Sequence, residues 1–233
     1  MFDNDSISAV IAKVAGIRES KPSMDLTPRH QCLIYRGAPS LQFPRIAKVL
    51  RQKLEQNYRC LYLNSPPMLT GMTRHLVAEG VDVAYETLRM SLIMSAEKNH
   101  LVDGRRFSVD RMMRDLEDAL EQALDDGYAG LWATGDMTWE LGPEVGSGKL
   151  LEYEWRLEEF FRSHPEIGGV CQYHIDSLPG VLIREGLCSH PGLFVNETLA
   201  MSNPHYVTPE MIGTSTLCDE DVTKFVDFLT DCR

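Results

Sequence analysis

The stretch GYAGLWATGDMTWEL, residues 127–141, decides the fold class. It follows a long amphipathic segment, and its apolar run Ala129 to Ala133 predicts a buried strand. The small-residue turn Thr134-Gly135-Asp136 is expected to end that strand, and two large side chains, Met137 and Trp139, follow the turn. In α/β proteins, ligands gather at the carboxyl ends of such strands. The stretch therefore predicts a binding site for a small molecule at the end of this strand.

Strand-like and helix-like segments alternate on both sides of this stretch. Further strands are predicted over Gln31–Tyr35, Arg59–Leu63, Leu88–Met94, Ile167–Tyr173 and Leu193–Val195. Helices are predicted over Leu41–Gln56, Pro67–Glu79, Ser108–Asp126, residues 147–163, Leu178–Leu187 and Asp219–Leu229. Such alternation produces βαβ units, whose strands are parallel and whose helices cover both faces of the sheet. We therefore predict a three-layer α/β fold with a mainly parallel central sheet.

The chain divides into a short N-terminal segment and one larger domain. Apolar residues at helical spacing predict an amphipathic helix over residues 5–18, and a polar connector with Pro22 and Pro28 completes residues 1–29. Residues 30–233 are predicted to form a single domain, because no linker rich in Pro, Gly or Ser divides them. The N-terminal helix is expected to dock on this domain or on a second copy of the chain.

Composition excludes several classes of protein. With 233 residues and 43% hydrophobic content, the chain is long enough for one large domain with a buried core. The net charge of −11 argues against direct contact with nucleic acid, which requires a basic surface. No apolar run approaches the roughly 20 residues that span a membrane, and the acidic N-terminus does not resemble a secretory signal. Six cysteines without a signal indicate reduced thiols, so we expect a cytoplasmic protein.

Two loops occupy places where a nucleotide hydrolase would carry its phosphate loop. GPEVGSGKL, residues 142–150, has Pro143 where the Walker pattern requires glycine and Leu150 where it requires Ser or Thr. RGAPSLQFP, residues 36–44, lacks the Gly-Lys-Ser/Thr signature altogether. Backbone amides near residue 147 remain an alternative anion site, because they precede a helix. We expect no ATPase or GTPase activity.

Three short Cys/His pairs occur: His30/Cys32, Cys171/His174 and Cys188/His190. Their spacings are not those of zinc knuckles, and buried cysteine in strands is common, so we predict core thiols and no metal, with a zinc site as the alternative. Cys171 and His174 are poorly arranged to act together as nucleophile and base, because residues three apart on a strand face opposite sides. The carboxylates of the helix after residue 147 (Glu152, Glu154, Glu158 and Glu159) are expected mostly to face water.

The predicted ligand site combines apolar walls with a few polar groups, as small-molecule pockets do. The walls are assigned to Trp139, Met137 and Tyr173. The polar contacts are assigned to Thr134, Asp136, His174 and His30. Two alternatives remain open: Asp136 can simply cap its turn, and Tyr173 can be a core residue, as is predicted for Trp132.

Seven blocks of sequence, in this order, resemble a known family. They are HQCLIY (His30–Tyr35), RCLYL (Arg59–Leu63), the helix opening FSVDRMM, GYAGLWATGDMTWEL, LLEYEWRLEEFF (Leu150–Phe161), VCQYH (Val170–His174) and GLCSHPGLFVN (Gly186–Asn196). Together they resemble the MEDS domain, the methanogen/methylotroph sensory domain typified by the regulator of dichloromethane dehalogenase. The resemblance covers about residues 28–206.

The resemblance implies a KaiC/RecA-like fold without a functional P-loop, and a role in sensing small organic compounds. Members of the family often carry a helix-turn-helix or histidine-kinase module. Residues 1–29 offer only one helix, and residues 207–233 are too few for a kinase. We therefore predict a stand-alone sensory domain in signalling or transcriptional regulation that has no cofactor, is not an enzyme, and acts through a regulatory protein partner. A homodimer is one possible assembly. The alternatives are a degenerate nucleotide-binding or zinc-dependent enzyme, and a scaffold without a ligand.

Overall fold

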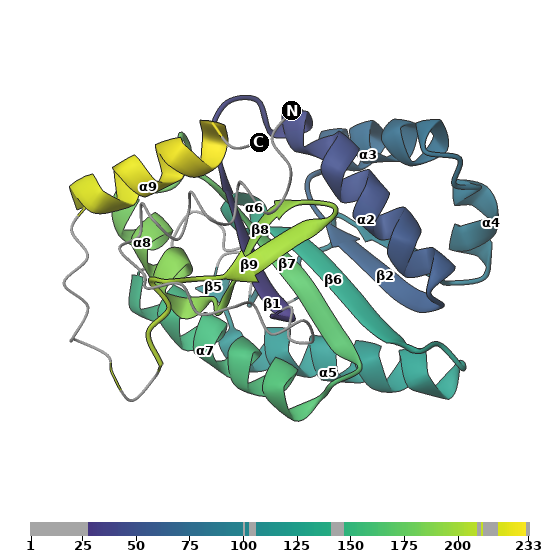
Figure 1. The fold of residues 1–233 in the computed structure, drawn as a ribbon. Coiled ribbons are helices and arrows are strands. Elements are labelled where there is room, and N and C mark those ends of the chain that lie inside the picture. Colours follow the sequence, from purple (N-terminus) through teal and green to yellow (C-terminus); the bar gives the residue numbers. More distant parts are fainter. Residues whose placement is uncertain are drawn as a thin grey trace.

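A seven-stranded, mainly parallel sheet forms the centre of the computed structural model (Figure 1). Its strands run in the order β3-β2-β6-β7-β1-β8-β9, and neighbours are parallel except β8 and β9. Their bounds are β1 (His30–Tyr35), β2 (Tyr58–Leu63), β3 (Leu92–Ser95), β6 (Gly130–Asp136), β7 (Ile167–His174), β8 (Gly192–Asn196) and β9 (Leu199–Ser202). A separate antiparallel pair consists of β4 (Leu101–Val102) and β5 (Arg106–Phe107).

The structure describes residues 28–99, 101–102, 106–140, 147–208, 211 and 219–231. The helix expected over residues 5–18, and with it the predicted docking of the N-terminal segment, lies outside these residues.

Helices cover both faces of the sheet, so the predicted three-layer α/β fold is confirmed (Figure 1). One face packs against α2 (Phe43–Glu55) and α3 (Pro66–Ala78), and the other against α5 (Val109–Asp125), α7 (Ser147–Ser163), α8 (Gly180–Ser189) and α9 (Asp219–Asp231). The remaining helices are the 3-10 turn η1 (Pro39–Gln42), α4 (Val83–Leu88) and α6 (Met137–Glu140). We call the two faces the α2 face and the α7 face.

Strand residues alternate between the two cores, because successive side chains on a strand point to opposite sides. In β1, Leu33 and Tyr35 lie in the core of the α2 face, whereas Cys32 and Ile34 lie in the core of the α7 face. Both faces of this central strand are therefore buried, as its continuous apolar run predicts. Trp132 belongs to the core of the α2 face, which confirms its predicted role.

Helix α5 follows its predicted pattern closely. The Ser108 hydroxyl accepts a hydrogen bond from the Arg111 amide at 3.4 Å and caps the helix, and Gly127 follows its end with φ +82°. Met112, Leu116 and the other inward residues are buried, but Leu124, which the periodicity also places inward, is 41% exposed. The end of the helix therefore extends past the core that it covers.

Three segments differ from the sequence-based predictions. The strand predicted over Leu88–Met94 begins only at Leu92, because α4, capped by the Asp82 carboxylate, occupies the preceding residues. The turn predicted at residues 134–136 is instead the last part of β6, which pairs with β2 and β7 along these residues. Strand β9 was not predicted, and it extends the sheet by antiparallel pairing with β8.

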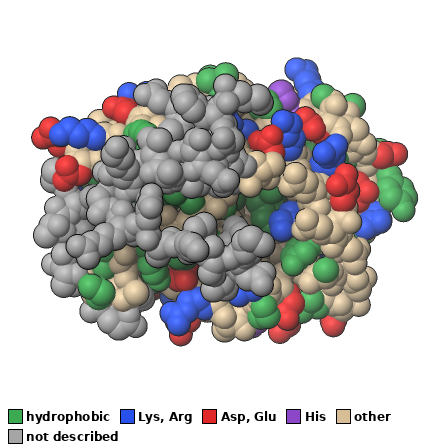
Figure 2. Space-filling model, viewed as in Figure 1, with side chains coloured by type: hydrophobic (Ala, Val, Ile, Leu, Met, Phe, Trp, Pro, Cys, Tyr) green, Lys and Arg blue, Asp and Glu red, His purple; other side chains and the backbone are tan. Residues whose placement is uncertain are grey.

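Charged side chains of both signs lie intermingled on the described surface in Figure 2. The described part of this face shows no continuous basic patch. Within the described ranges, none of the helices is both long enough and apolar enough to cross a membrane.

Candidate functional site

Polar and aromatic side chains meet at the carboxyl ends of four adjacent strands on the α2 face. Tyr35 and His174 end β1 and β7, Asp136 ends β6, and Tyr62 and Asn64 lie at the end of β2. Tyr35 and His174 stack with ring centroids 5.1 Å apart, and Asn64 donates to the Tyr62 hydroxyl at 3.2 Å. We call these five residues the strand-end cluster.

Burial shapes the electrostatics of the strand-end cluster. Burial, and then the nearby Asp136 carboxylate, raise the pKa of Tyr35 above its usual value. Burial likewise raises the pKa of Tyr62, although the hydrogen bond from Asn64 opposes this shift. Both phenols are therefore neutral around pH 7 and can donate hydrogen bonds, whereas a carboxylate such as Asp136 accepts them.

The loop after β1 is held to the end of β7 by hydrogen bonds. The Nε2 of His174 donates to the Gly37 carbonyl at 2.7 Å, and the Gly37 amide donates to the Asp176 carboxylate at 2.8 Å. The other ring nitrogen of His174 lies 2.6 Å from the Ser177 hydroxyl. Gly37 has φ +81°, a conformation that glycine adopts without strain. This loop occupies the position of a phosphate loop, but the Asp176 carboxylate, just after the end of β7, already engages the Gly37 amide.

Of the predicted ligand residues, Thr134, Asp136 and His174 do lie at the carboxyl edge. The Thr134 hydroxyl donates to the Val170 carbonyl at 2.7 Å, and the Asp136 carboxylate accepts from the Thr138 amide at 2.8 Å. Met137 is buried in the core of the α7 face. Trp139 lies in α6, and its side chain lies outside the described part of the chain.

The predicted placement of His30 at this edge is wrong, and Tyr173 lies near the edge but on the other face of the sheet. His30 begins β1 and pairs with Gly169, so it lies five residues, roughly 16 Å, before the carboxyl end of the strand. Tyr173 precedes His174 and therefore faces the opposite side of the sheet, where its hydroxyl donates to Glu154. His30 belongs instead to a second group of polar side chains, and Tyr173 contacts that group through Glu154.

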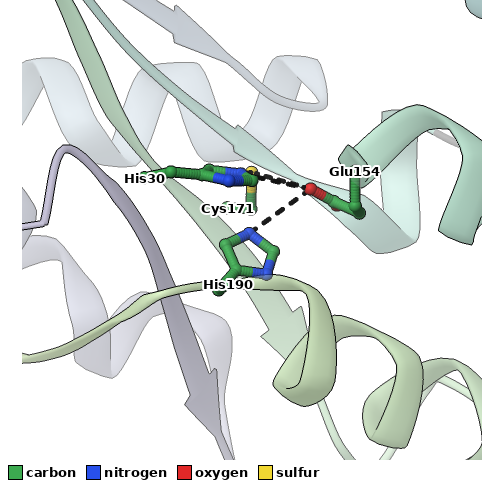
Figure 3. Close-up of side chains that lie close together, drawn as sticks. All are labelled: His30, Glu154, Cys171 and His190. Atoms are coloured by element: carbon green, nitrogen blue, oxygen red, sulfur yellow. Dashed lines mark hydrogen bonds and ion pairs between the residues drawn. The ribbon is translucent and has the colours of Figure 1, made fainter. Parts of the chain in front are cut away.

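That second group, which we call the buried centre, consists of His30, Glu154, Cys171 and His190 (Figure 3). The four residues come from β1, α7, β7 and the end of α8, and each is buried. One donor atom from each lies within 4.8 Å of the others. Their chemistry, with two imidazoles, a thiol and a carboxylate, is that of zinc-binding sites in proteins. We predicted no metal site at the Cys/His pairs, but these four residues could hold an ion.

Hydrogen bonds fix three of the four side chains from outside the buried centre. His30 Nδ1 lies 3.1 Å from a Glu158 carboxylate oxygen, and His190 Nδ1 donates to the Gly186 carbonyl at 2.6 Å. The Tyr173 hydroxyl donates to the Glu154 oxygen that does not face the histidines. Each of these bonds orients a side chain so that its other donor atom points into the centre (Figure 3).

The pKa values of the two imidazoles are shifted in opposite directions. Burial lowers the pKa of His190 to about 3, with His30 adding to the effect, so this ring is neutral around pH 7. Burial also acts to lower the pKa of His30, but the contacts with Glu154 and Glu158 outweigh burial and raise it. Burial opposes ionisation of Glu154, yet the two histidines and the Tyr173 hydroxyl hold its pKa below the usual value.

The buried centre takes one member from each of the three Cys/His pairs. Cys171 and His174 face opposite sides of β7, which confirms that they are poorly arranged to act as a pair. The expectation for the carboxylates of α7 holds for Glu152 and Glu159, which are exposed, but it is wrong for Glu154 and Glu158, which are buried. Helical spacing could have predicted this burial, because Glu154 and Glu158 lie on the same face of the helix as the buried residues Leu150, Tyr153, Leu157 and Phe161.

Comparisons with known proteins agree with the sequence resemblance. Residues 29–191 match the family described as MEDS, the MEthanogen/methylotroph, DcmR Sensory domain. No curated protein is similar enough to count as a match. Among solved structures, the chain is similar to the flagellar accessory protein FlaH from Methanocaldococcus jannaschii, with a TM-score of 0.46 and 13% sequence identity. That similarity covers 79% of this chain and 75% of FlaH.

Proposed function

This chain belongs to the MEDS family of sensory domains, and we propose that it binds a small organic ligand and passes the signal to a partner protein. The observation that carries the proposal is the convergence of Tyr35, Tyr62, Asp136 and His174 at one edge of the sheet. Open α/β sheets bind ligands at this edge, outside the carboxyl ends of their strands.

The chemistry of the strand-end cluster favours a ligand with an apolar body and one polar group. The apolar neighbours of the cluster on this face of the sheet are core residues such as Trp132, which precedes Asp136 by four residues on the same face of β6. The phenols of Tyr35 and Tyr62 supply donors, and the Asp136 carboxylate supplies an acceptor. A few polar groups beside apolar side chains are typical of small-molecule sites.

The signal is proposed to leave through the segment that follows β6. This segment, from Met137 to Ser147, contains Gly142 and Gly146 in its sequence and connects β6 to α7. Residues 141–146 of this segment lie outside the described part of the chain. A ligand that contacts Asp136 would act on α6, which directly follows it, and a signalling or regulatory protein would bind the ligand-dependent arrangement of α6.

Tryptophan fluorescence tests the ligand site. In a Trp155→Phe background, Trp132 of β6 and Trp139 of α6 remain and report on this part of the chain. A panel of small halogenated, methylated and aromatic compounds is titrated against the protein. We expect at least one compound to change the emission. Asp136→Asn and His174→Ala should then each weaken its affinity about tenfold or more, the loss that follows from one hydrogen bond to a charged or polar group.

Asp118→Asn provides the matched control, because Asp118 is an exposed carboxylate on α5 at the other face. This variant should bind as the parent does. The proposed site is wrong if Asp136→Asn and His174→Ala bind every detected compound with parental affinity.

The nucleotide-hydrolase alternative leads to a separate prediction. Lys149 donates to the Phe107 carbonyl at 3.3 Å, Leu150 follows it in place of a metal-binding hydroxyl, and the Gly37 amide is already bonded to Asp176. The groups that cradle phosphate and magnesium in hydrolases of this kind are therefore missing or engaged. We expect no ATP or GTP turnover above background in a phosphate-release assay with magnesium. Turnover that disappeared in Lys149→Ala would contradict this expectation.

A further inference from the structure

We propose that the buried centre binds one transition-metal ion of the zinc class through His30, Glu154, Cys171 and His190. The centre lies on the α7 face, opposite the strand-end cluster. The proposal therefore stands independently of the ligand site proposed above.

The distances within the buried centre match tetrahedral coordination. Glu154 Oε2 lies 3.3 Å from Nε2 of both His30 and His190, and Cys171 Sγ lies 3.8 Å from His30 Nε2 and 3.9 Å from Glu154 Oε2. With the usual zinc–ligand distances, neighbouring nitrogen and oxygen donors in a tetrahedral site are about 3.3 Å apart, and pairs that include sulfur about 3.6 Å apart. The remaining pairs of donor atoms, from His190 to His30 and to Cys171, lie within 4.8 Å, so an ion at the middle of the four atoms would draw these side chains closer together.

His190 gives an independent reason to place a cation here. Its Nδ1 donates to the Gly186 carbonyl, which can only accept, so in the neutral ring Nε2 carries a lone pair. This Nε2 is buried and lacks a hydrogen-bond partner, although Glu154 Oε2 lies 3.3 Å away. Two lone pairs that face each other in a closed interior are unfavourable unless a proton or a metal ion lies between them. A metal ion at this point would also contact His30 Nε2 and Cys171 Sγ, which lie beside the same Glu154 oxygen, whereas a proton would not.

The surroundings of the centre have the features of a metal site. Histidine ligands usually donate their second ring nitrogen to a carboxylate or a backbone carbonyl, which fixes the tautomer that binds metal. The partner of the second ring nitrogen is the Glu158 carboxylate for His30 and the Gly186 carbonyl for His190. The Tyr173 hydroxyl bonds to the second oxygen of Glu154, as is also usual for a ligating carboxylate.

Charge and coordination number indicate the kind of ion and its role. A divalent ion together with a Cys171 thiolate and a Glu154 carboxylate is neutral, which avoids burying net charge at the four ligands. A tetrahedral set of nitrogen, sulfur and oxygen donors favours zinc over magnesium or calcium. Four protein ligands leave no open position for water, so the centre is a closed site that stabilises the fold and not a hydrolytic one. The ion would link α7 and the end of α8 to β1 and β7.

Metal analysis of the untagged chain of 233 residues is the first test. Protein expressed with added zinc and then dialysed against metal-free buffer should retain one zinc ion per chain. When the protein is unfolded with chelator and refolded with cobalt(II), it should show thiolate-to-cobalt charge-transfer absorption, a signature that requires a cysteine ligand. A zinc content far below one per chain, together with no cobalt spectrum after refolding, would overturn the proposal.

Variants identify the ligands. Cys171→Ser should lose the charge-transfer band, and His190→Gln should lower metal content to a small fraction of the parental value. Cys60→Ser is the matched control, because Cys60 is equally buried but lies on the α2 face, and it should keep the band. If a variant fails to fold, the wild-type cobalt spectrum still decides whether a thiolate binds metal. An unchanged band in folded Cys171→Ser would place the metal elsewhere and overturn the assignment.

Discussion

Replacement of Glu154 by alanine is expected to lower the free energy of unfolding by about 3–5 kcal/mol, the usual cost of removing one partner from a buried charged network. The Glu154 carboxylate is fully buried, lies 3.3 Å from Nε2 of both His30 and His190, and accepts a hydrogen bond from the Tyr173 hydroxyl. Its removal leaves these groups without a partner where water cannot replace it. Equilibrium unfolding in urea or guanidinium measures the loss.

Glu159→Ala is the control for helix α7, since Glu159 is an exposed carboxylate five residues further along the same helix. Its effect should stay within about 0.5 kcal/mol, as for most surface substitutions. If Glu154→Ala lowered the free energy of unfolding by less than about 1 kcal/mol, the contacts of Glu154 with His30, His190 and Tyr173 would contribute little to stability.

Glu154→Gln separates the role of charge from the role of shape. The amide has nearly the same size as the carboxylate and can still accept from Tyr173, so it should destabilise the chain less than alanine does. It should nevertheless abolish the rise in Tm that zinc produces in the wild-type protein, because a bound ion stabilises only a state that holds it. A zinc-dependent rise that survived in Glu154→Gln would remove Glu154 from the set of ligands.

Much of the fold follows from the sequence because local periodicity and long-range packing agree. The alternating cores around β1 and the capped helix α5 are examples, since each has a clear pattern and clear end signals. The segment Leu88–Met94 shows the limit of this approach. Its apolar residues suit a strand, but the Asp82 cap begins a helix just upstream, and the strand starts only where Leu92 pairs with Cys60 of β2.

The strand-end cluster could be predicted in part, and the buried centre could not. Parallel strands bring Asp136 and His174 to one edge, which sheet topology predicts, but the alternation of side chains puts Tyr173 on the other face. The buried centre depends on the strand order β7-β1-β8, which places Cys171 beside His30 and brings the end of α8 next to both. Spacing within a sequence does not contain that order. A prediction that considers each Cys/His pair separately therefore misses a site that takes one residue from each pair.

Gly169→Ala is expected to destabilise the chain by about 3 kcal/mol or more, at the upper end of the range for overpacked interiors. Gly169 lies in β7 between Ala133 of β6 and His30 of β1. A Cβ at this position would lie 2.2 Å from the Ala133 carbonyl oxygen, a backbone atom that can move only if the two strands separate. Urea unfolding measures the effect.

Gly148→Ala is the matched control, because a Cβ there meets nothing within 4 Å in the first turn of α7. Alanine is the better helix former, so this variant should gain about 0.5–1 kcal/mol. Equal effects of the two substitutions would show that the close approach of β6 and β7 is not rigid. Because Gly169 pairs with His30, a folded Gly169→Ala protein should also bind less zinc than Gly148→Ala. Loss of stability with full zinc binding would instead mean that the buried centre tolerates displacement of the strand that carries His30.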